Sequence, residues 1–374
     1  MATYIKKAIS TNKNEIEAIK ELKQQLHQED LAGIIFFCSR DYDLEKLEQE
    51  LDKNFDCPII GCTTAGELNP NYVNGSIAAT SFSSEKFVFH THSILDAKNY
   101  NSKIAKEEIE KIKKGLKFSS DLDSQKMFTF LLNDGVSMNE ELITASLFDA
   151  LQGVPIVGGT AADNFEFTSA LVYADKKFRD NCSTYVVIET KLDFDVYQLQ
   201  HFEPTDDDII ITKADPSTRR VYEIDGENAA DMISELVGVS KEQLTTNIYT
   251  EYPLLLQIGE HWHVRAMAKV MDDDSIYFAC AIDEGIPLTI GKSKGLLKGL
   301  KEDVTMIKNR FKNIELTLGC DCAYRQLEVS ALDIKEEVST ELEKLNFIGF
   351  STFGEQFNSV HVNQTLTCVV IGEK

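Results

Sequence analysis

The chain has 374 residues, of which 38 are basic and 61 are acidic, so its formal net charge is −23 at neutral pH. This length is typical of two or three domains. The negative charge argues against partners that are themselves negative, such as nucleic acids or anionic membranes. Hydrophobic residues make up 43% of the chain, which excludes an intrinsically disordered protein.

The distribution of apolar residues and cysteines indicates a cytoplasmic protein. No apolar run reaches the roughly 18 residues that span a bilayer, and the first residues lack the apolar stretch of a secretory signal. The eight cysteines are scattered, mostly in apolar segments, which is typical of buried thiols in a reducing compartment. No C-x-x-C motif is present, so a zinc ribbon is not supported.

A strand–helix–strand pattern occurs three times and is the most informative feature of the sequence. Each copy begins with an apolar run, continues with a polar, helix-like stretch and closes with a short segment that contains glycine and threonine or serine. We predict that each copy is a βαβ unit whose two strands are parallel, with a right-handed crossover. The copies span residues 31–67, 127–163 and 314–355.

The closing segments form the predicted ligand crevice, because parallel sheets usually bind ligands beyond the carboxyl ends of their strands. Glycine at such a turn permits a positive φ and close approach of the backbone, and the hydroxyl two residues later could contact a ligand. The alternative is that these glycines serve only the turn. The candidate residues are Gly61 and Thr63, Gly158 and Thr160, and Gly349 and Ser351.

The segments between the repeats add further strands and helices. Residues 77–82 and 87–92 have the composition of strands and are predicted to form a hairpin, as are residues 170–173 and 184–188. Helices are predicted over 98–116, 225–244 and 291–311, and two strands within 266–282. Together these elements predict an α/β protein with mixed sheets built from repeated βαβ units.

Few side chains suggest catalysis. The nucleophile-elbow, zinc-protease and P-loop motifs are absent. Cys62 or a nearby hydroxyl could serve as a nucleophile, but no base lies next to it in the sequence. Arg265 is a cation in a segment that otherwise looks buried, so it could bind a ligand carboxylate. An internal salt bridge from Arg265 to Glu284 or Glu355 is the alternative.

Several segments resemble the FIST proteins, a bacterial family of sensory and signalling proteins with an N-terminal and a C-terminal FIST segment. The resemblance extends over roughly residues 30 to 370. It implies a sensor of small ligands and divides the chain into a FIST N-terminal domain, 1–225, and a FIST C-terminal domain, 226–374. The matching segments are Ile60–Glu67, Gly158–Asp163, Val221–Ala230, His263–Met267, Gly349–Gln356 and His361–Thr365.

The chain looks similar to the FIST branch that senses nitric oxide through haem b and acts on a partner histidine kinase. The sequence carries no kinase segment of its own, so we expect the output to pass through a histidine kinase or another signalling enzyme. The resemblance makes His201 and His361 the candidate iron ligands, with Arg265 as a candidate partner of a propionate. Cys57 is a thiolate alternative, although Val154 precedes the equivalent proline of the second repeat.

Two other interpretations remain open. A haem-free FIST sensor would bind a small metabolite such as an amino acid, using Arg265 and the three glycine segments. An enzyme would act through Cys62 or a nearby hydroxyl. Either protein could form an oligomer, and neither is expected to bind nucleic acid or a membrane.

Overall fold

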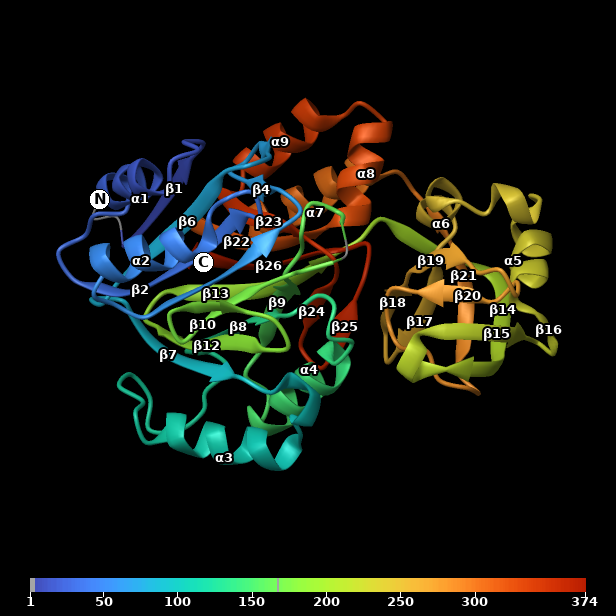
Figure 1. The fold of residues 1–374 in the computed structure, drawn as a ribbon, viewed down its shortest axis with the longest axis horizontal. Helices are drawn as coiled ribbons and strands as arrows, with labels where there is room; N and C mark the ends of the chain where they lie inside the picture. The colour runs from blue at the N-terminus through green and yellow to red at the C-terminus, as the bar shows by residue number, and fades with distance from the viewer. Residues whose placement is uncertain (1–3, 167) are drawn as a thin grey trace.

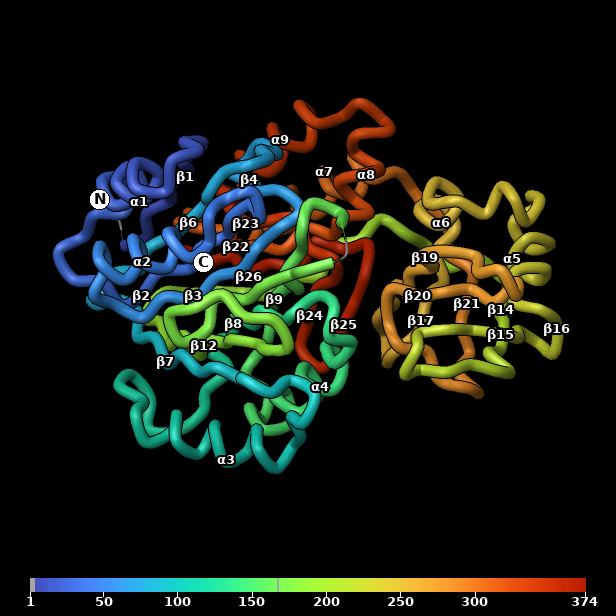
Figure 2. The backbone as a smooth tube through the Cα atoms, in the orientation of Figure 1, coloured from blue at the N-terminus to red at the C-terminus, as the bar shows by residue number. Residues whose placement is uncertain are grey.

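The computed structural model describes residues 4–166 and 168–374. The chain is divided into a large body and a smaller lobe, which lies to the right in Figure 1. One continuous stretch forms the lobe, from β14 (Phe202–Asp215) to β21 (Pro287–Ser293). This stretch can be followed in yellow and orange in Figure 2. The chain crosses between body and lobe along neighbouring strands, because Phe202 pairs with Ser293.

The three predicted βαβ units are present in the body, and the two strands of each unit are parallel. The first strand of each unit is largely buried on both faces, which explains its apolar sequence. The mixed α/β fold built from repeated units is therefore confirmed. The units are β2 (Leu31–Ser39), α2 (Leu44–Asn54) and β3 (Ile59–Thr64); β8 (Met127–Asn133), α4 (Glu140–Ala150) and β9 (Ile156–Thr160); and β22 (Asn313–Cys322), α8 (Ala323–Ala331), α9 (Lys335–Glu343) and β23 (Phe347–Thr352).

Local signals explain why the polar stretch of a unit becomes a helix. In α2 the side chain of Asp43 accepts a hydrogen bond from the backbone N–H of Lys46, which caps the first turn. Leu47 and Leu51 are four residues apart and are both buried, so the helix has one apolar face. The rest of the helix surface is polar and faces solvent.

Each unit lies in its own six-stranded sheet, and the three sheets have the same strand order. Each sheet begins with an outer strand. A strand antiparallel to it follows, here called the closing strand, then the two parallel strands of the unit and finally a short hairpin. The sheets are β1 (Ile5–Ser10), β6 (Ile77–Ser83), β2, β3, β10 (Val172–Ala174) and β11 (Lys177–Arg179); β7 (Phe87–Ile94), β12 (Ser183–Thr190), β8, β9, β24 (Glu355–Phe357) and β25 (Val360–Val362); and β13 (Asp193–Leu199), β26 (Leu366–Glu373), β22, β23, β4 (Glu67–Leu68) and β5 (Tyr72–Val73).

The final hairpin of each sheet comes from a different unit. The hairpin β10–β11 of the second unit completes the first sheet by pairing with β3. The hairpin β24–β25 of the third unit pairs with β9 of the second, and β4–β5 of the first pairs with β23 of the third. The units thus exchange hairpins in a closed ring, so each sheet needs two units.

The two predicted hairpins are wrong in their pairing, although their strands exist. β6 pairs with β1 and β2, whereas β7 pairs with β12 in a different sheet. Likewise, β10 pairs with β3 and β11, whereas β12 pairs with β7 and β8. The first parallel strand of each unit has two edges. Its parallel partner pairs with one edge, and the closing strand pairs with the other.

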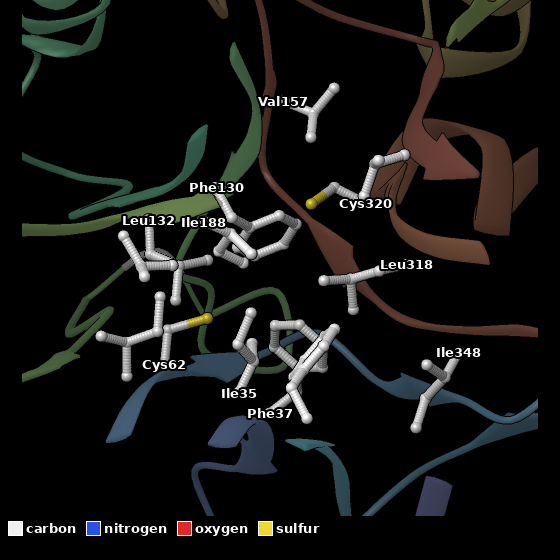
Figure 3. Packing of buried hydrophobic residues seen from close by; sticks show 14 of the residues in the cluster. Ile35, Phe37, Cys62, Phe130, Leu132, Val157, Ile188, Leu318, Cys320 and Ile348 are labelled. Carbon is white, nitrogen blue, oxygen red and sulfur yellow. The ribbon is translucent and has the colours of Figure 1, made fainter. Parts of the chain in front are cut away.

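The three sheets pack around one common core, and the helices of the body lie outside them (Figure 1). Phe37, Phe130 and Cys320, one from each sheet, meet in this core (Figure 3). The rings of Phe37 and Phe350 stack with their centroids 4.4 Å apart. Among the described residues, no helix has both the length and the apolar character needed to cross a membrane. The remaining outer helices are α1 (Glu15–Gln25), α3 (Ser102–Lys113) and α7 (Leu296–Arg310).

The lobe has a separate core and an eight-stranded sheet. It occupies the connection between β13 and α7 of the third unit, whereas the other two units pass from β1 to α1 and from β7 to α3 without such an insertion. The predicted boundary between residues 225 and 226 lies in the turn between β15 and β16, inside this sheet. The other lobe elements are β15 (Arg220–Ile224), β16 (Glu227–Asn228), α5 (Ala229–Val237), α6 (Thr246–Glu251), β17 (Leu254–Ile258), β18 (His261–Arg265), β19 (Met267–Val270) and β20 (Ile276–Phe278).

Candidate functional site

A cavity of about 330 Å³ lies between the lobe and the body. This volume is at the lower end of the roughly 300–1,000 Å³ that is typical of small-molecule pockets. Both parts of the molecule contribute to its wall. The body supplies Gly135, Glu140, Thr160, Phe165, Ala323, Tyr324, Leu327, Phe353 and His361, and the lobe supplies Arg219, Thr246, Ala268, Tyr277 and Ala279.

The cavity lies at the carboxyl ends of parallel strands in the second and third units. Glu140 is the first residue of α4, the helix after β8, and Tyr324 is the second residue of α8, which directly follows β22. Thr160 is the last residue of β9. Binding beyond the carboxyl ends of the strands is the general rule for parallel α/β sheets, so this position is where a ligand is expected.

Arg219 is the cation of the cavity wall and is almost completely buried. It follows the short 3₁₀ helix Pro216–Thr218 and has a left-handed backbone with φ 54°. Its Nη2 donates to Oε2 of Glu140 at 2.7 Å and lies 3.2 Å from Oε2 of Glu141. Its Nη1 donates to the carbonyl of Ala279 at 3.1 Å. One guanidinium therefore joins the lobe to the first turn of α4.

This cluster holds two carboxyl groups for one guanidinium. Burial raises the pKa of Glu140 to about 7, although the charge of Arg219 acts to lower it. Glu141 accepts a further hydrogen bond, at 2.8 Å, from the backbone N–H of Ala281 in the lobe. The cluster at the cavity therefore holds more carboxyl groups than cations.

Aromatic rings form much of the remaining wall. Tyr277 comes from the lobe, and Tyr324, Phe165 and Phe353 come from the body. The rings of Phe165 and Phe353 lie with their centroids 6.5 Å apart. The hydroxyl of Tyr324 donates to the carbonyl of Met267 at 3.3 Å, so α8 is also bonded to the lobe. The cavity thus combines one ionic cluster with a largely aromatic surface.

His361, a predicted ligand, lies in the cavity wall on β25. Its Nδ1 lies 3.2 Å from Nε2 of Gln356. The ring packs so closely against Gly354 that a Cβ there would lie 2.4 Å from Cε1 of the imidazole. Burial lowers the pKa of His361 to about 4, so the imidazole is neutral at neutral pH.

Arg265 lies beside the cavity and not in its wall. Its Nη1 donates to the carbonyl of His361 at 2.9 Å, which links the end of β18 in the lobe to β25 in the body. The carboxylates of Glu284 and Glu355, the alternative partners, accept hydrogen bonds from other residues. In this arrangement the guanidinium holds the two parts of the molecule together through a backbone carbonyl.

His201 lies outside the cavity wall, where the chain passes from the body into the lobe. Its Nδ1 lies 3.3 Å from Nη1 of Arg325 and its Nε2 lies 3.0 Å from Oε2 of Glu328. Burial lowers the pKa of His201. Both partners are on α8, which also carries Tyr324 of the cavity. His201 therefore ties the crossing point to α8 and does not lie beside His361 in one site.

The predicted glycines lie within the second strand of each unit and not in turns. Gly61, Gly158 and Gly349 pair at equivalent positions with the first strand, and none has a positive φ, so that expectation is wrong. The expected close approach exists, but it is between strands. A Cβ on Gly349 would lie 1.9 Å from the carbonyl oxygen of Gly319. These glycines allow neighbouring strands to meet.

The three predicted hydroxyl residues have different surroundings. The hydroxyl oxygen of Thr63 accepts a hydrogen bond from the backbone N–H of Leu171 at 2.9 Å. The backbone N–H of Thr160, which lines the cavity, donates to the hydroxyl oxygen of Thr352 at 2.8 Å. The buried hydroxyl of Ser351 has no hydrogen-bond partner in the part of the chain that the structure describes. Ligand contact through Thr63, Thr160 and Ser351 stays a prediction.

Comparison with known protein families identifies the family to which this chain belongs. Residues 32–227 match the FIST N domain, and residues 229–358 match the FIST C domain. The chain belongs to the FIST family. FIST domains are sensory domains of signal transduction, and here both segments line the same cavity, Glu140 and Arg219 in FIST N and Tyr277 and Tyr324 in FIST C.

The FIST chain is also similar to a protein from an archaeon. Over 334 residues it is 24% identical to the Uncharacterized protein MJ1623 of Methanocaldococcus jannaschii. The match covers 83% of this chain but only 63% of that protein, so the chain spans less than two thirds of its relative.

The residues of the FIST cavity do not fit haem b in the conformation described. Among the described wall residues, His361 supplies the one imidazole, and Gln356 and the carbonyl of Ala279 both hydrogen-bond to its ring. Arg219 is the one cation of that wall and is already paired with two carboxylates, so propionate groups would find no free cation. A cavity of about 330 Å³ is also small for a macrocycle.

The two cysteine candidates have the properties of protonated thiols. Cys62 is completely buried, and burial raises its pKa well above the ordinary value, which opposes its use as a nucleophile. Burial also raises the pKa of Cys57 to about 11, and this residue lies outside the wall of the cavity between lobe and body.

The sequence reasoning missed Arg219, Glu140, Glu141 and the aromatic wall. A signal existed for the two glutamates, because they form the first turn of the helix after a buried strand, where a crevice is expected. For Arg219 there was no comparable signal. Its role depends on a left-handed turn in the lobe that brings the guanidinium to α4, and such a contact is non-local.

Proposed function

We propose that this FIST protein is a sensor that binds a small metabolite, such as an amino acid, in the cavity between lobe and body and passes the signal to a partner such as a histidine kinase. One observation carries the proposal: the FIST N and FIST C segments both line one cavity of ligand size. The family's sensory role supports the same conclusion.

The geometry gives a physical route from ligand to output. Several polar contacts join the lobe to the body. They are made by the carboxyl groups that bind Arg219, by the carbonyl of His361 and by the hydroxyl of Tyr324. A ligand that touches both walls binds best when they are close together, so it shifts the population toward a closed arrangement. The partner would distinguish the two arrangements.

The test is a thermal-shift screen of amino acids and related metabolites on the whole protein, because a ligand that binds only the native state raises its melting temperature. Each positive compound is then tested on Tyr324→Leu, which removes a ring from the cavity wall, and on Tyr222→Leu, which removes a ring from β15 outside that wall. Loss of the shift only in Tyr324→Leu supports the proposal. Positive compounds that bind both variants equally, or a screen without any positive compound, contradict it.

A second candidate is the sensing of nitric oxide through haem b, with regulation of a histidine kinase. One observation favours it: His361 is neutral and lies in the cavity wall, and iron binds the neutral imidazole. The wall would have to rearrange before this residue could hold the group. An absorption spectrum of protein expressed with a haem precursor decides the matter. A stoichiometric Soret band that is lost in His361→Gln supports haem binding, and a colourless protein excludes it.

A further inference from the structure

We propose that the cavity recognises its ligand through a cationic ammonium group, so that the ligand is an organic amine with an apolar body and not an anion. The inference rests on the proposed function and specifies the chemical class of its ligand. It follows from the charges and rings of the cavity wall.

The first step concerns the charges. Nη2 of Arg219 is shared by two carboxyl groups, at 2.7 Å from Glu140 and 3.2 Å from Glu141, and Nη1 is bonded to the carbonyl of Ala279. A ligand carboxylate would have to compete with these partners for the guanidinium. Among the described wall residues there is no second cation, because His361 is neutral. The ionic cluster therefore disfavours an anion, and Glu140 brings a carboxyl group into the cavity wall, where a cation could share it with Arg219.

The second step concerns the rings. Two tyrosines and two phenylalanines line the same cavity as the carboxylates. The face of an aromatic ring attracts a cation, and desolvation strengthens this attraction. Carboxylate and aromatic faces together provide both the charge and the apolar contact that an ammonium ion on a hydrocarbon body requires. A carboxylate ligand would gain from neither.

The test uses three ligands that share one phenyl body and differ in charge. Phenethylamine is cationic, 3-phenylpropan-1-ol is neutral and 3-phenylpropionate is anionic. Their affinities for the whole protein are measured by isothermal titration calorimetry at neutral pH. We expect phenethylamine to bind at least about tenfold more tightly than the other two, which corresponds to about 1.4 kcal/mol. Equal binding of all three, tighter binding of the anion or no binding of the amine overturns the inference.

A matched pair of variants locates the effect. Glu140→Gln removes a carboxylate from the cavity wall, whereas Glu227→Gln removes the same charge from an exposed position of the lobe. We expect Glu140→Gln, but not Glu227→Gln, to weaken the binding of phenethylamine by about tenfold. Neither variant should change the affinity for the alcohol. If Glu140→Gln does not fold, Tyr324→Leu is used in its place. Its control is then Tyr324→Phe, because phenylalanine keeps the ring. A weakening that is the same in variant and control contradicts the inference.

The outcome is separate from that of the proposed function. Should the metabolite screen yield neutral or anionic compounds whose binding depends on Tyr324, the sensor function stands and the preference for a cation is wrong. A screen without positive compounds contradicts the function itself.

Discussion

Gly349 differs from alanine by a single methyl group, and the fold has no room for that group. The added Cβ would lie 1.9 Å from the carbonyl oxygen of Gly319 in the adjacent parallel strand. Gly158 occupies the equivalent position of the second unit, and a Cβ there would lie 2.0 Å from the carbonyl oxygen of Leu131. A Cβ on Gly61 in the first unit would meet the ring of Phe36 at 2.4 Å and its carbonyl oxygen at 2.5 Å. The repeated glycine in the sequence is therefore explained by strand packing.

We expect Gly349→Ala to reduce the free energy of unfolding by about 1–3 kcal/mol, because the backbones of two paired strands must move apart. Urea unfolding followed by circular dichroism measures the change. Gly115→Ala is the control, since its Cβ would lie 3.5 Å from the nearest atom, an ordinary contact. A variant at position 349 that is as stable as the control would show that the strands separate without cost.

His361 should make stability depend on pH. Its pKa in the folded protein is about 4 and its ordinary value is 6.5, because burial disfavours the charged ring and Arg219 and Arg265 act with burial, whereas Glu141 opposes it. Between pH 4 and 6.5 the unfolded chain therefore binds more protons than the folded one. Stability is complete above pH 6.5 and falls as the pH decreases toward 4.

We expect the advantage of the wild type over His361→Gln in free energy of unfolding to shrink by about 2 kcal/mol between pH 7.5 and pH 5. Urea titrations at the two pH values measure it. His27→Gln, which changes an exposed histidine, should show no such shift. An advantage that is constant with pH would mean that the pKa of His361 is the same in the folded and the unfolded protein.

At the residue scale, the repeated pattern identified the glycines but not their role, since they lie within strands and not in turns. Repetition pointed to Gly61, Gly158 and Gly349 as special, and the structure shows why. The binding wall depends instead on pairs such as Arg219 with Glu140, which lie 79 residues apart and meet only through the folded lobe. Nothing in the sequence around either residue records the presence of the other.

At the scale of the elements, a buried acid supports two of the exchanged hairpins. Glu67 of β4 accepts hydrogen bonds from the backbone N–H and the hydroxyl of Ser76, at 3.0 and 2.6 Å. Glu355 of β24 accepts the same pair from Thr365, at 3.1 and 2.7 Å. In each case the acid fastens the hairpin to the segment that leads into the closing strand of the unit. The similarity extends the repeat beyond the βαβ elements.

Burial raises the pKa of Glu355 well above its ordinary value, which favours the neutral carboxyl group. We therefore expect Glu355→Gln to change stability little, because the amide oxygen can accept both hydrogen bonds. Glu355→Leu should cost roughly 1–3 kcal/mol, because the N–H and hydroxyl of Thr365 lose their acceptor inside the protein. Thermal unfolding of both variants measures the difference. An equal loss in the two variants would indicate an ionised carboxylate.

The sequence was sufficient to predict many of the strands and helices and the three parallel pairs, because periodicity and composition are properties of short windows. It was not sufficient to predict which strands share a sheet. β6 and β7 are adjacent in the chain and lie in different sheets, whereas β4 pairs with β23. Pairing is decided by which edge is left open in the assembled body, and no local pattern carries that information.

At the scale of the whole molecule, the sheets and the predicted domain boundary divide the chain differently. A fragment of residues 1–225 would contain β14 and β15 without β21 and β20, which pair with them in the lobe. A fragment of residues 202–293 contains the complete lobe sheet and its core.

We expect the fragment 202–293 to unfold in one cooperative transition in urea. The fragment 1–225 should lack such a transition, because its second and third sheets would miss the strands of the third unit. Near-ultraviolet circular dichroism and the dispersion of amide-proton chemical shifts report whether the side chains of each fragment are packed in a fixed arrangement. A cooperative transition in residues 1–225 would support that boundary as the limit of a folding unit.

The exchange of hairpins also affects how the protein is made. The partner of Leu68 in β4 is Gly349, so 349 − 68 = 281 residues must be added before this pair can form. At roughly 5–20 residues per second, the ribosome needs about 15 to 55 seconds for that length. During this time the nascent chain carries an incomplete ring of sheets with open edges, which are sites for misassociation. Folding of the body is therefore completed only near the end of synthesis.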